Sequence, residues 1–171
     1  MRQTIGLALH ADAMLYETAI AAEVFGVDRA DLSPTGTWYE LVACTPDGAP
    51  SPWLPGCPAR GFAELADLDT VVVPSTSDLD GQPDAALLAG LRAARDAGAR
   101  IAALCTGAFV LAAAGLLDGH RAATHWMHAD QLARRYPGVD VRSDVLYVDD
   151  GQVLTSAGKT AALDLCLHLV H

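Results

Sequence analysis

The chain has 171 residues, and 51% of them are hydrophobic, which suits one globular domain with a full core rather than a disordered segment. Its formal charge of −10 repels phosphate backbones, so this stretch alone is not expected to bind nucleic acid. No apolar run reaches the roughly 18 residues that a membrane span needs, and the N-terminus does not read as a signal peptide. We therefore expect a cytoplasmic protein with no membrane partner.

Short apolar runs alternate with helical patterns along the first half of the chain. A Pro- and Gly-rich stretch, 46–58, is expected to form a loop with room for an edge hairpin. Asp84 is a suitable helix N-cap, and Gly98 is a suitable helix stop. The elements predicted in order are a strand at Thr4–Leu9, a helix at Tyr16–Phe25, strands at Trp38–Cys44 and Thr70–Val73, and a helix from Asp84 to Ala97.

The second half continues the alternation and adds a hairpin, because Asp150-Gly151 suits a tight two-residue turn. The last helix is expected to face inward through Leu163, Leu167 and Val170. The predicted order is a strand at Arg100–Leu104, a turn at Cys105, a helix to Ala114, a short strand at Arg121–Thr124, a helix at Met127–Tyr136, strands at Val145–Val148 and Gln152–Thr155, and a helix at Thr160–His171.

This alternation predicts an α/β fold: a doubly wound, mainly parallel sheet with helices on both faces and one β-hairpin. We expect residues 1–171 to form a single domain. Ligands bind outside the carboxyl ends of the strands in such folds. Three loops should meet there, namely the loop after Leu9, the loop after Val73 and the turn at Cys105.

Cys105 occupies the position of a nucleophile, because it lies on a tight turn between a buried strand and a helix. Backbone N–H groups at the start of that helix would stabilise a thiolate or a developing oxyanion. The alternative is that Cys105 is a small buried hydrophobic residue, which we assign to Cys44 and Cys166. Cys57 lies in the Pro-rich loop. The wide spacing of the four cysteines favours reduced thiols over a disulfide framework.

Two ionisable side chains are candidates to join Cys105. Glu17 begins the first helix, and a protonated Glu17 would donate a hydrogen bond to the Cys105 thiolate. His125 could act as a base, or it could simply pack beside Trp126. His125 and His128 are three residues apart, so the two side chains could bind one metal ion. We favour the interpretation that one of them belongs to the site and the other lies on a helix surface. We predict no metal and no cofactor.

Thr106, Gly107 and Ser75 complete the predicted site as ligand-binding residues. Thr106 offers a hydroxyl and a backbone N–H directly after the cysteine. Gly107 would let a ligand approach the backbone closely. Ser75 belongs to the loop after the third predicted strand, and this loop and the Pro-rich loop are expected to set ligand specificity.

Several segments resemble the ThiJ/PfpI superfamily, which has the class I glutamine-amidotransferase-like fold. The resemblance covers nearly the whole chain and is carried by Leu104–Gly119, Ala123–Trp126, Asp144–Gly158, Glu17 and Glu23–Gly26. Within the superfamily, the Cys-Thr-Gly elbow, Thr-His-Trp and Leu-Thr-Ser-Ala-Gly are most similar to the N-terminal domains of AraC-type (GlxA-like) transcriptional regulators.

The resemblance implies a homodimer with a small-molecule pocket at Cys105, and DNA binding through a C-terminal helix-turn-helix domain that these residues do not contain. It places Glu17, Cys105 and His125 in the positions of the family's acid, nucleophile and nearby histidine. Thr106 stands where the peptidases of the superfamily carry histidine, which argues against peptidase activity. The sequence also departs from the family pattern at Ala11-Asp12 and at Lys159.

Three functions therefore stay open at this point. The first is the ligand-sensing and dimerisation domain of an AraC-type regulator, without catalysis. The second is a small-molecule enzyme resembling isonitrile hydratases or glyoxalases, with Cys105 as nucleophile, although the hydratases use aspartate where Glu17 stands. The third is a redox sensor, because an exposed thiolate of low pKa oxidises readily.

Overall fold

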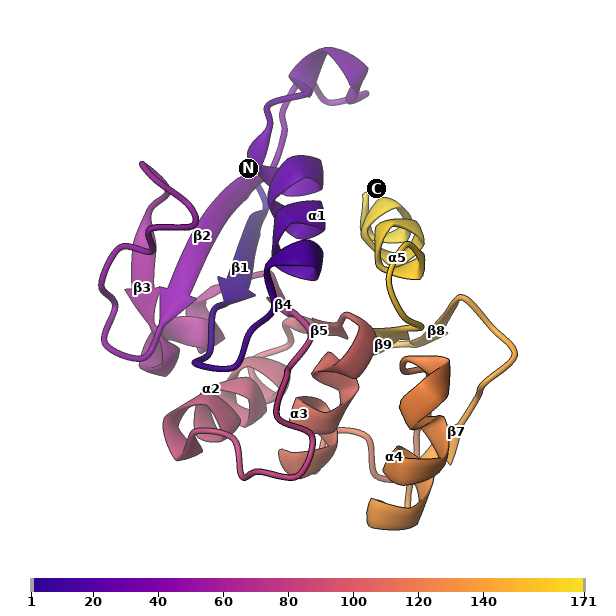
Figure 1. Ribbon diagram of the computed structural model, residues 1–171. Coiled ribbons are helices and arrows are strands. Elements are labelled where there is room, and N and C mark those ends of the chain that lie inside the picture. The colour runs from indigo at the N-terminus through magenta and orange to yellow at the C-terminus, as the bar shows by residue number, and fades with distance from the viewer. Residues whose placement is uncertain (1, 171) are drawn as a thin grey trace.

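A seven-stranded, mainly parallel sheet forms the middle of the molecule (Figure 1). This computed structural model describes residues 2–170. The strands are β1 (Thr4–Ala8), β2 (Glu40–Thr45), β3 (Ala59–Gly61), β4 (Thr70–Val73), β5 (Arg100–Ala103), β8 (Tyr147–Asp150) and β9 (Val153–Ser156). They lie in the order β3-β2-β1-β4-β5-β9-β8, and among these pairs β8 alone runs antiparallel to its neighbour.

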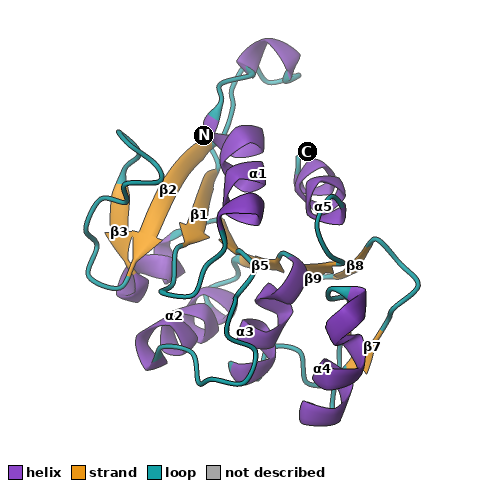
Figure 2. Ribbon diagram, viewed as in Figure 1, coloured by secondary structure: helices purple, strands orange, loops and turns teal. Residues whose placement is uncertain are grey.

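Helices cover both faces of the sheet (Figure 2). Helices α1 (Leu15–Gly26) and α5 (Ala161–Leu169) lie together on one face, and α2 (Ala85–Asp96) and α3 (Ala108–Ala113) lie on the other. In β4, Val71 and Val73 point to the α2 side, whereas Val72 points to the α1 side. This alternation explains why the strand is apolar throughout, and it confirms the predicted doubly wound fold.

Several predicted boundaries are confirmed closely. The Asp84 side chain caps α2 by accepting a hydrogen bond of 2.6 Å from the Ala86 N–H, and Gly98 follows the helix with φ +97°. The remaining short elements are 3-10 turns at Ala30–Leu32, Phe62–Asp67, Cys105–Gly107 and Trp126–His128, helix α4 (Ala129–Arg135), and strands β6 (Arg121–Ala122) and β7 (Asp140–Val141).

Two predictions about strands need correction. The stretch 46–58 contains no edge hairpin, and the strand that follows it, β3, pairs in parallel with β2. The β8–β9 hairpin turns at Gly151-Gln152, one residue later than predicted, because Asp150 still pairs with Val153. Strand β6 lies outside the main sheet and pairs with β7.

The inward face of the last helix was assigned to the wrong residues. Leu163 and Leu167 are 42% and 55% exposed, while Val170 is only partly buried. The helix ends at Leu169, and His171, where the predicted helix ended, lies outside the described residues. The face that packs against the sheet consists of Ala161, Ala162, Leu165, Cys166 and Leu169.

The three loops predicted to meet at the carboxyl edge of the sheet do so. The Met14 N–H donates to the Ser75 carbonyl (3.0 Å), and the Ser77 N–H donates to the Asp12 carbonyl (2.9 Å). Thr76 in turn is hydrogen-bonded to Thr106, which follows the Cys105 turn. Main-chain hydrogen bonds therefore join the loops after β1 and β4, and the Thr106 hydroxyl joins the loop after β4 to the turn after β5.

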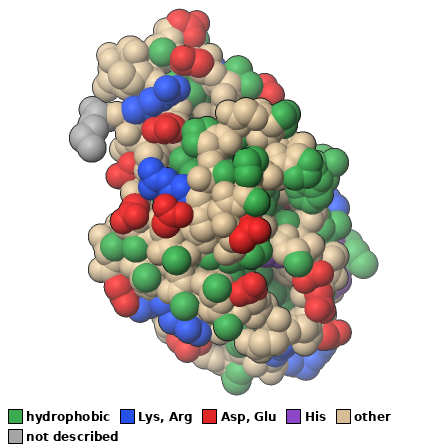
Figure 3. Space-filling model, turned by 90° about the vertical axis from the view of Figure 1, so that its left-hand side faces the viewer, with side chains coloured by type: hydrophobic (Ala, Val, Ile, Leu, Met, Phe, Trp, Pro, Cys, Tyr) green, Lys and Arg blue, Asp and Glu red, His purple; other side chains and the backbone are tan. Residues whose placement is uncertain are grey.

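No helix within residues 2–170 is long and apolar enough to cross a membrane. Acidic and basic side chains are interspersed on the face that Figure 3 shows.

Candidate functional site at the Cys105 elbow

Cys105 sits on a strained turn between β5 and α3. Its φ is +56°, a left-handed conformation that is uncommon for a residue with a side chain. Two hydrogen bonds hold the turn: the Cys105 N–H donates to Ser156 Oγ (3.1 Å), and Thr124 Oγ1 donates to the Cys105 carbonyl (3.0 Å). The residue is only 3% exposed. The surrounding structure therefore enforces a backbone that the cysteine alone would avoid.

The surroundings of Cys105 favour the protonated form of its thiol. Burial raises its pKa above the ordinary value, and the nearby charge of Glu17 acts in the same direction. Hydrogen bonds from the backbone of Lys159 and Thr106 lower the pKa but do not overcome the burial. The backbone therefore acts on the thiolate in the expected direction, and burial is the larger effect.

Glu17 is fully buried beside this thiol. Its Oε2 accepts a hydrogen bond of 2.5 Å from Ser75 Oγ, and its Oε1 has no hydrogen-bond partner among the described residues. The predicted hydrogen bond from Glu17 to Cys105 is thus replaced by one from Ser75. Ser75 orients the carboxyl group, while Oε1 stays available to a donor that enters the site.

His125 caps the 3-10 turn at Trp126–His128, because its Nδ1 accepts a hydrogen bond of 3.2 Å from the Met127 N–H. A neutral ring then carries its proton on Nε2. Partial burial lowers the pKa of His125, and the positive charges of His128 and Lys159 lower it further. The charges of Glu17 and Lys159 act on the pKa values of both Cys105 and His125.

Thr106 and Gly107 lock the elbow in place. Thr106 Oγ1 donates to the Thr76 carbonyl (2.8 Å) and accepts from the Thr76 N–H (2.9 Å). A Cβ atom on Gly107 would lie 2.7 Å from the carbonyl oxygens of Val73 and Pro74. The space around Gly107 is therefore filled by the end of β4, and the glycine is required for packing there.

Lys159 is the residue whose place the sequence did not reveal. It is the single lysine of the chain and has a left-handed backbone, with φ +58°. Its backbone hydrogen-bonds with the Cys105 sulfur, and its ammonium lies 5.7 Å from the ring centroid of Tyr16. The sequence signal for Lys159 was that a lysine is unusual directly after Gly158. Its positive φ could not be predicted from the sequence.

The other cysteines are structural. Cys44 and Cys166 are fully buried, and burial raises the pKa of each to about 12, as expected for small core residues. The Cys57 thiol donates to the Leu41 carbonyl (3.1 Å). All four cysteines are free. Among residues 2–170, no group of three His, Cys, Asp or Glu side chains could hold a metal ion.

These features define a class of α/β domains built around a candidate nucleophile. In this class a cysteine lies on a strained turn after a parallel strand, and a glutamate and a histidine are the candidate ionisable partners. The DJ-1/PfpI family model matches residues 61–171, and the chain belongs to this family.

Relatives of the chain include both regulators and an enzyme. An uncharacterized protein from the cpoL 5′ region of Streptomyces lividans is 42% identical over 120 residues, which cover 68% of this chain and 82% of that protein. The HTH-type transcriptional regulator GlxA of Rhizobium meliloti (strain 1021) is 34% identical over 168 residues, which cover 95% of this chain and 51% of the regulator. The isonitrile hydratase of Pseudomonas putida is 34% identical over 133 residues, which cover 77% of this chain and 55% of the enzyme.

Solved structures share the fold over the whole chain. The crystal structure of Drosophila melanogaster DJ-1beta has a TM-score of 0.77 and 23% identity, and the match covers 99% of this chain and 89% of that one. An AraC family transcriptional regulator from Pseudomonas putida has a TM-score of 0.74 and 22% identity, with 98% and 90% covered. At this identity the likeness concerns the fold.

Proposed function

We propose that this chain is the ligand-sensing and dimerisation domain of an AraC-type transcriptional regulator, with its small-molecule pocket at the Cys105 elbow. The observation that carries the proposal is the buried Cys105 thiol, whose pKa burial raises, next to a Glu17 oxygen without a hydrogen-bond partner. A neutral thiol is a weak nucleophile, whereas a buried carboxyl oxygen without a partner favours a ligand that donates a hydrogen bond. The similarity to the regulator GlxA over most of the chain supports this choice.

Binding and turnover can be separated with the same variants. We expect a ligand found in a thermal-shift screen of small metabolites to stabilise the wild-type protein. The shift should be lost in Glu17→Gln and Cys105→Ser but retained in Cys57→Ser, which changes a thiol elsewhere. Mass spectrometry should recover the ligand unchanged. A ligand whose shift survives both elbow substitutions would place the sensing pocket elsewhere.

Dimerisation is assigned to the exposed apolar face of α1 and α5. Leu163 and Leu167 are four residues apart on one stripe of α5, and Leu15 and Tyr16 are exposed at the start of the neighbouring α1 (Figure 1). Sedimentation should show a dimer that Leu163→Glu or Leu167→Glu dissociates. Leu32→Glu alters an exposed leucine that belongs to neither α1 nor α5 and serves as the control. A monomeric wild-type protein would contradict the assignment.

Under this proposal DNA binding is supplied by a helix-turn-helix segment encoded after residue 171. The reading frame of the gene tests this part directly. A stop codon at that point would exclude DNA binding in cis and favour the second candidate.

The second candidate is a cysteine-dependent small-molecule enzyme. It is favoured by the position of Cys105 on the elbow, by the charge of Glu17 acting on both Cys105 and His125, and by the similarity to an isonitrile hydratase. A neutral thiol would have to transfer its proton before attacking an electrophilic carbon. Assays with isonitriles and with methylglyoxal test this candidate. Turnover that disappears in Cys105→Ala and persists in Cys57→Ala would establish it.

A further inference from the structure

Strand β8 lies at one end of the strand order, so β9 is its single neighbour in the sheet that the structure describes (Figure 2). At the start of this antiparallel pair, the Leu146 carbonyl accepts a hydrogen bond of 2.7 Å from the first residue after β9. Residues that bond to the partner strand alternate with residues that do not. Val148 and Asp150 therefore face β9, as Leu146 does. The N–H and carbonyl groups of Tyr147 and Asp149 point away from it, and no other group within residues 2–170 hydrogen-bonds to them.

The two faces of the hairpin are covered by other elements. On one face, Tyr147 and Asp149 contact His168 of α5, with 2.8 Å between Asp149 Oδ2 and His168 Nε2. On the other face, Asp150 Oδ1 accepts a hydrogen bond of 2.9 Å from Arg121 of β6. Strand β6 pairs with β7 in a sheet of their own. It therefore lies over a face of the hairpin and does not close the outer side of β8.

A cavity of about 280 Å³ lies on this outer side. Tyr147 and Val148 of β8 both line it, together with part of the exposed segment 143–146. Neighbouring residues of a strand point to opposite faces of the sheet, so a cavity that both line lies beside the strand. Arg121 and Arg142 form the wall on the β6–β7 side. A chain that pairs with β8 would run about 4.8 Å from it, through this space.

The charges along this edge determine which chain can pair with it. Asp144, Asp149 and Asp150 lie in or before β8, and residues 143–150 contain no lysine or arginine. The two arginines of the cavity are already paired, one with Asp150 and the other with Asp140. Like charges that face each other destabilise a strand pair, whereas opposite charges stabilise it. A second copy of β8 would bring its own aspartates, so the edge disfavours itself and favours a basic strand.

We propose that the open edge of β8 is a docking surface for an extended, basic segment of a partner protein, which pairs antiparallel with β8 and has lysine or arginine at alternate positions. The main chain of two basic residues bonds to the N–H and carbonyl groups of Tyr147 and Asp149. Directly opposite residues share a face, so the basic side chains lie on the α5 side, next to the Asp149 carboxylate. The uncharged side chains between them lie on the side of Arg121 and Arg142. The surface is separate from Cys105, so it does not depend on the function proposed there.

Hydrogen exchange of single amides, followed by NMR on the whole chain, tests the edge directly. In the free protein the amides of Tyr147 and Asp149 should exchange at least about tenfold faster than those of Val148 and Asp150. The peptide acetyl-Val-Lys-Val-Lys-Val-amide should slow the exchange of both edge amides about tenfold or more at saturation. Edge amides that are protected in the free protein show that the edge is already closed, or paired with a second copy if protection grows with protein concentration. Either result overturns the proposal, as does exchange that a high peptide concentration leaves unchanged.

Variants of the peptide separate strand pairing from simple charge attraction. N-methylation of the two lysine amides removes the N–H groups that bond to β8, and it should weaken binding about tenfold or more. N-methylation of the middle valine, whose N–H points away from β8, should leave binding unchanged. Replacing both lysines by glutamate should abolish binding. Equal binding of the peptide methylated at its lysines, or binding of the glutamate peptide, would contradict the proposed pairing.

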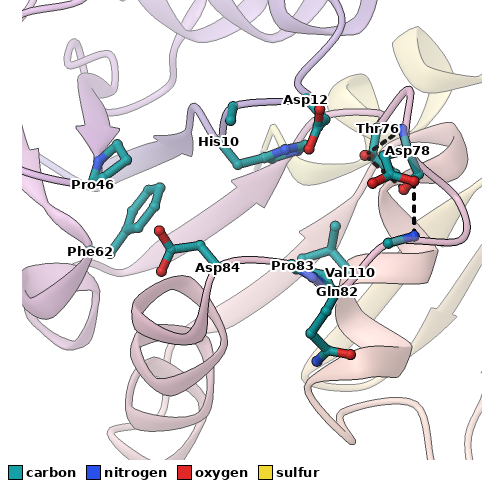
Figure 4. A pocket seen from close by; sticks show the side chains of 12 residues that line it. His10, Asp12, Pro46, Phe62, Thr76, Asp78, Gln82, Pro83, Asp84 and Val110 are labelled. Atoms are coloured by element: carbon teal, nitrogen blue, oxygen red, sulfur yellow. Dashed lines mark hydrogen bonds between the residues drawn. The ribbon is translucent and has the colours of Figure 1, made fainter.

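Variants of the protein test the choice of a basic partner. Asp149→Asn should weaken binding of the lysine peptide several-fold and leave that of acetyl-Val-Gln-Val-Gln-Val-amide unchanged. Asp12→Asn is the matched control, because Asp12 is an exposed acidic residue that lines a separate cavity between the loops after β1 and β4 (Figure 4). Unchanged affinity of the lysine peptide in Asp149→Asn would mean that the edge does not select basic chains. Cys105→Ser should retain peptide binding, so failure at the elbow and failure at this edge can be told apart.

Discussion

The ring of His125 lies directly against Gly158, where a Cβ atom would come within 2.2 Å of His125 Cδ2. The glycine therefore sets how closely His125 approaches the elbow. Because Gly158 immediately precedes Lys159, one short segment both contacts the His125 ring and carries the lysine that acts on Cys105.

Gly158→Ala should push the His125 ring out of the site. We expect the pKa of His125, now lowered by partial burial and by its positively charged neighbours, to rise toward that of a solvated histidine. The crowding should also lower the free energy of unfolding by about 1 to 3 kcal/mol. NMR titration of the His125 ring and urea denaturation measure the two effects. Gly138→Ala is the control, because its Cβ would meet only ordinary contacts.

Glu17→Gln should make Cys105 more reactive. The charge of Glu17 raises the pKa of the Cys105 thiol, so its removal should lower that pKa and increase the thiolate fraction at pH 8. Iodoacetamide labelling of Cys105, followed by mass spectrometry, should accelerate a few-fold. Glu23→Gln, which removes an exposed glutamate paired with Arg29, should leave the rate unchanged. A slower reaction in Glu17→Gln would show that the glutamate assists the thiolate.

The order of thiol labelling tests the redox-sensor hypothesis. Cys105 is 3% exposed, whereas Cys57 is only partly buried in the Pro-rich loop. At neutral pH we therefore expect Cys57 to react first, which speaks against Cys105 as a sensor of oxidants. If Cys105 reacts first, the redox hypothesis regains support.

Thr106→Val should destabilise the elbow, because it leaves the Thr76 N–H and carbonyl without their shared partner. Each buried group that loses its hydrogen bond costs about 1 to 3 kcal/mol. Urea denaturation should show this loss, and Thr106→Ser, which keeps the hydroxyl, should recover most of it. Equal stability of the two variants would mean that Thr76 finds other partners.

His10 makes stability depend on pH between 7 and 5. Its folded pKa is below the ordinary value of 6.5, so the unfolded chain binds more protons in this range. The free energy of unfolding should accordingly fall as the pH drops through 6.5 toward the folded pKa. In His10→Asn the decline between pH 7 and 5 should be shallower, with the contribution of His125 remaining. An unchanged slope would mean that His10 is not held neutral in the folded protein.

Hydrophobic periodicity and capping residues were sufficient to predict the fold. The run Thr70–Val73 is β-branched or apolar at every position because both faces of β4 are covered, and it forms a strand with those bounds. The position of Cys105 on a turn was predicted in the same way, from an apolar strand that is followed at once by a helix. The last helix was misassigned because Leu163 and Leu167 form an apolar stripe that faces away from the core, and apolar spacing alone does not say which side is buried.

The electrostatics of the site depend on contacts between distant segments, which no local pattern encodes. Ser75 reaches Glu17 across 58 residues of sequence, and the Lys159 backbone reaches Cys105 across the sheet edge. The sequence likewise does not show that the backbone of Val73 and Pro74 lies where a side chain at Gly107 would be.

The single lysine of these residues, Lys159, acts on the Cys105 thiol and offers one defined site for chemical labelling. Apart from the N-terminal amine, an amine-directed dye has Lys159 as its one attachment point in these residues. Fluorescence from such a dye would report ligand binding near Cys105 without an engineered cysteine. Acetylation of Lys159 would remove the positive charge of the single lysine side chain.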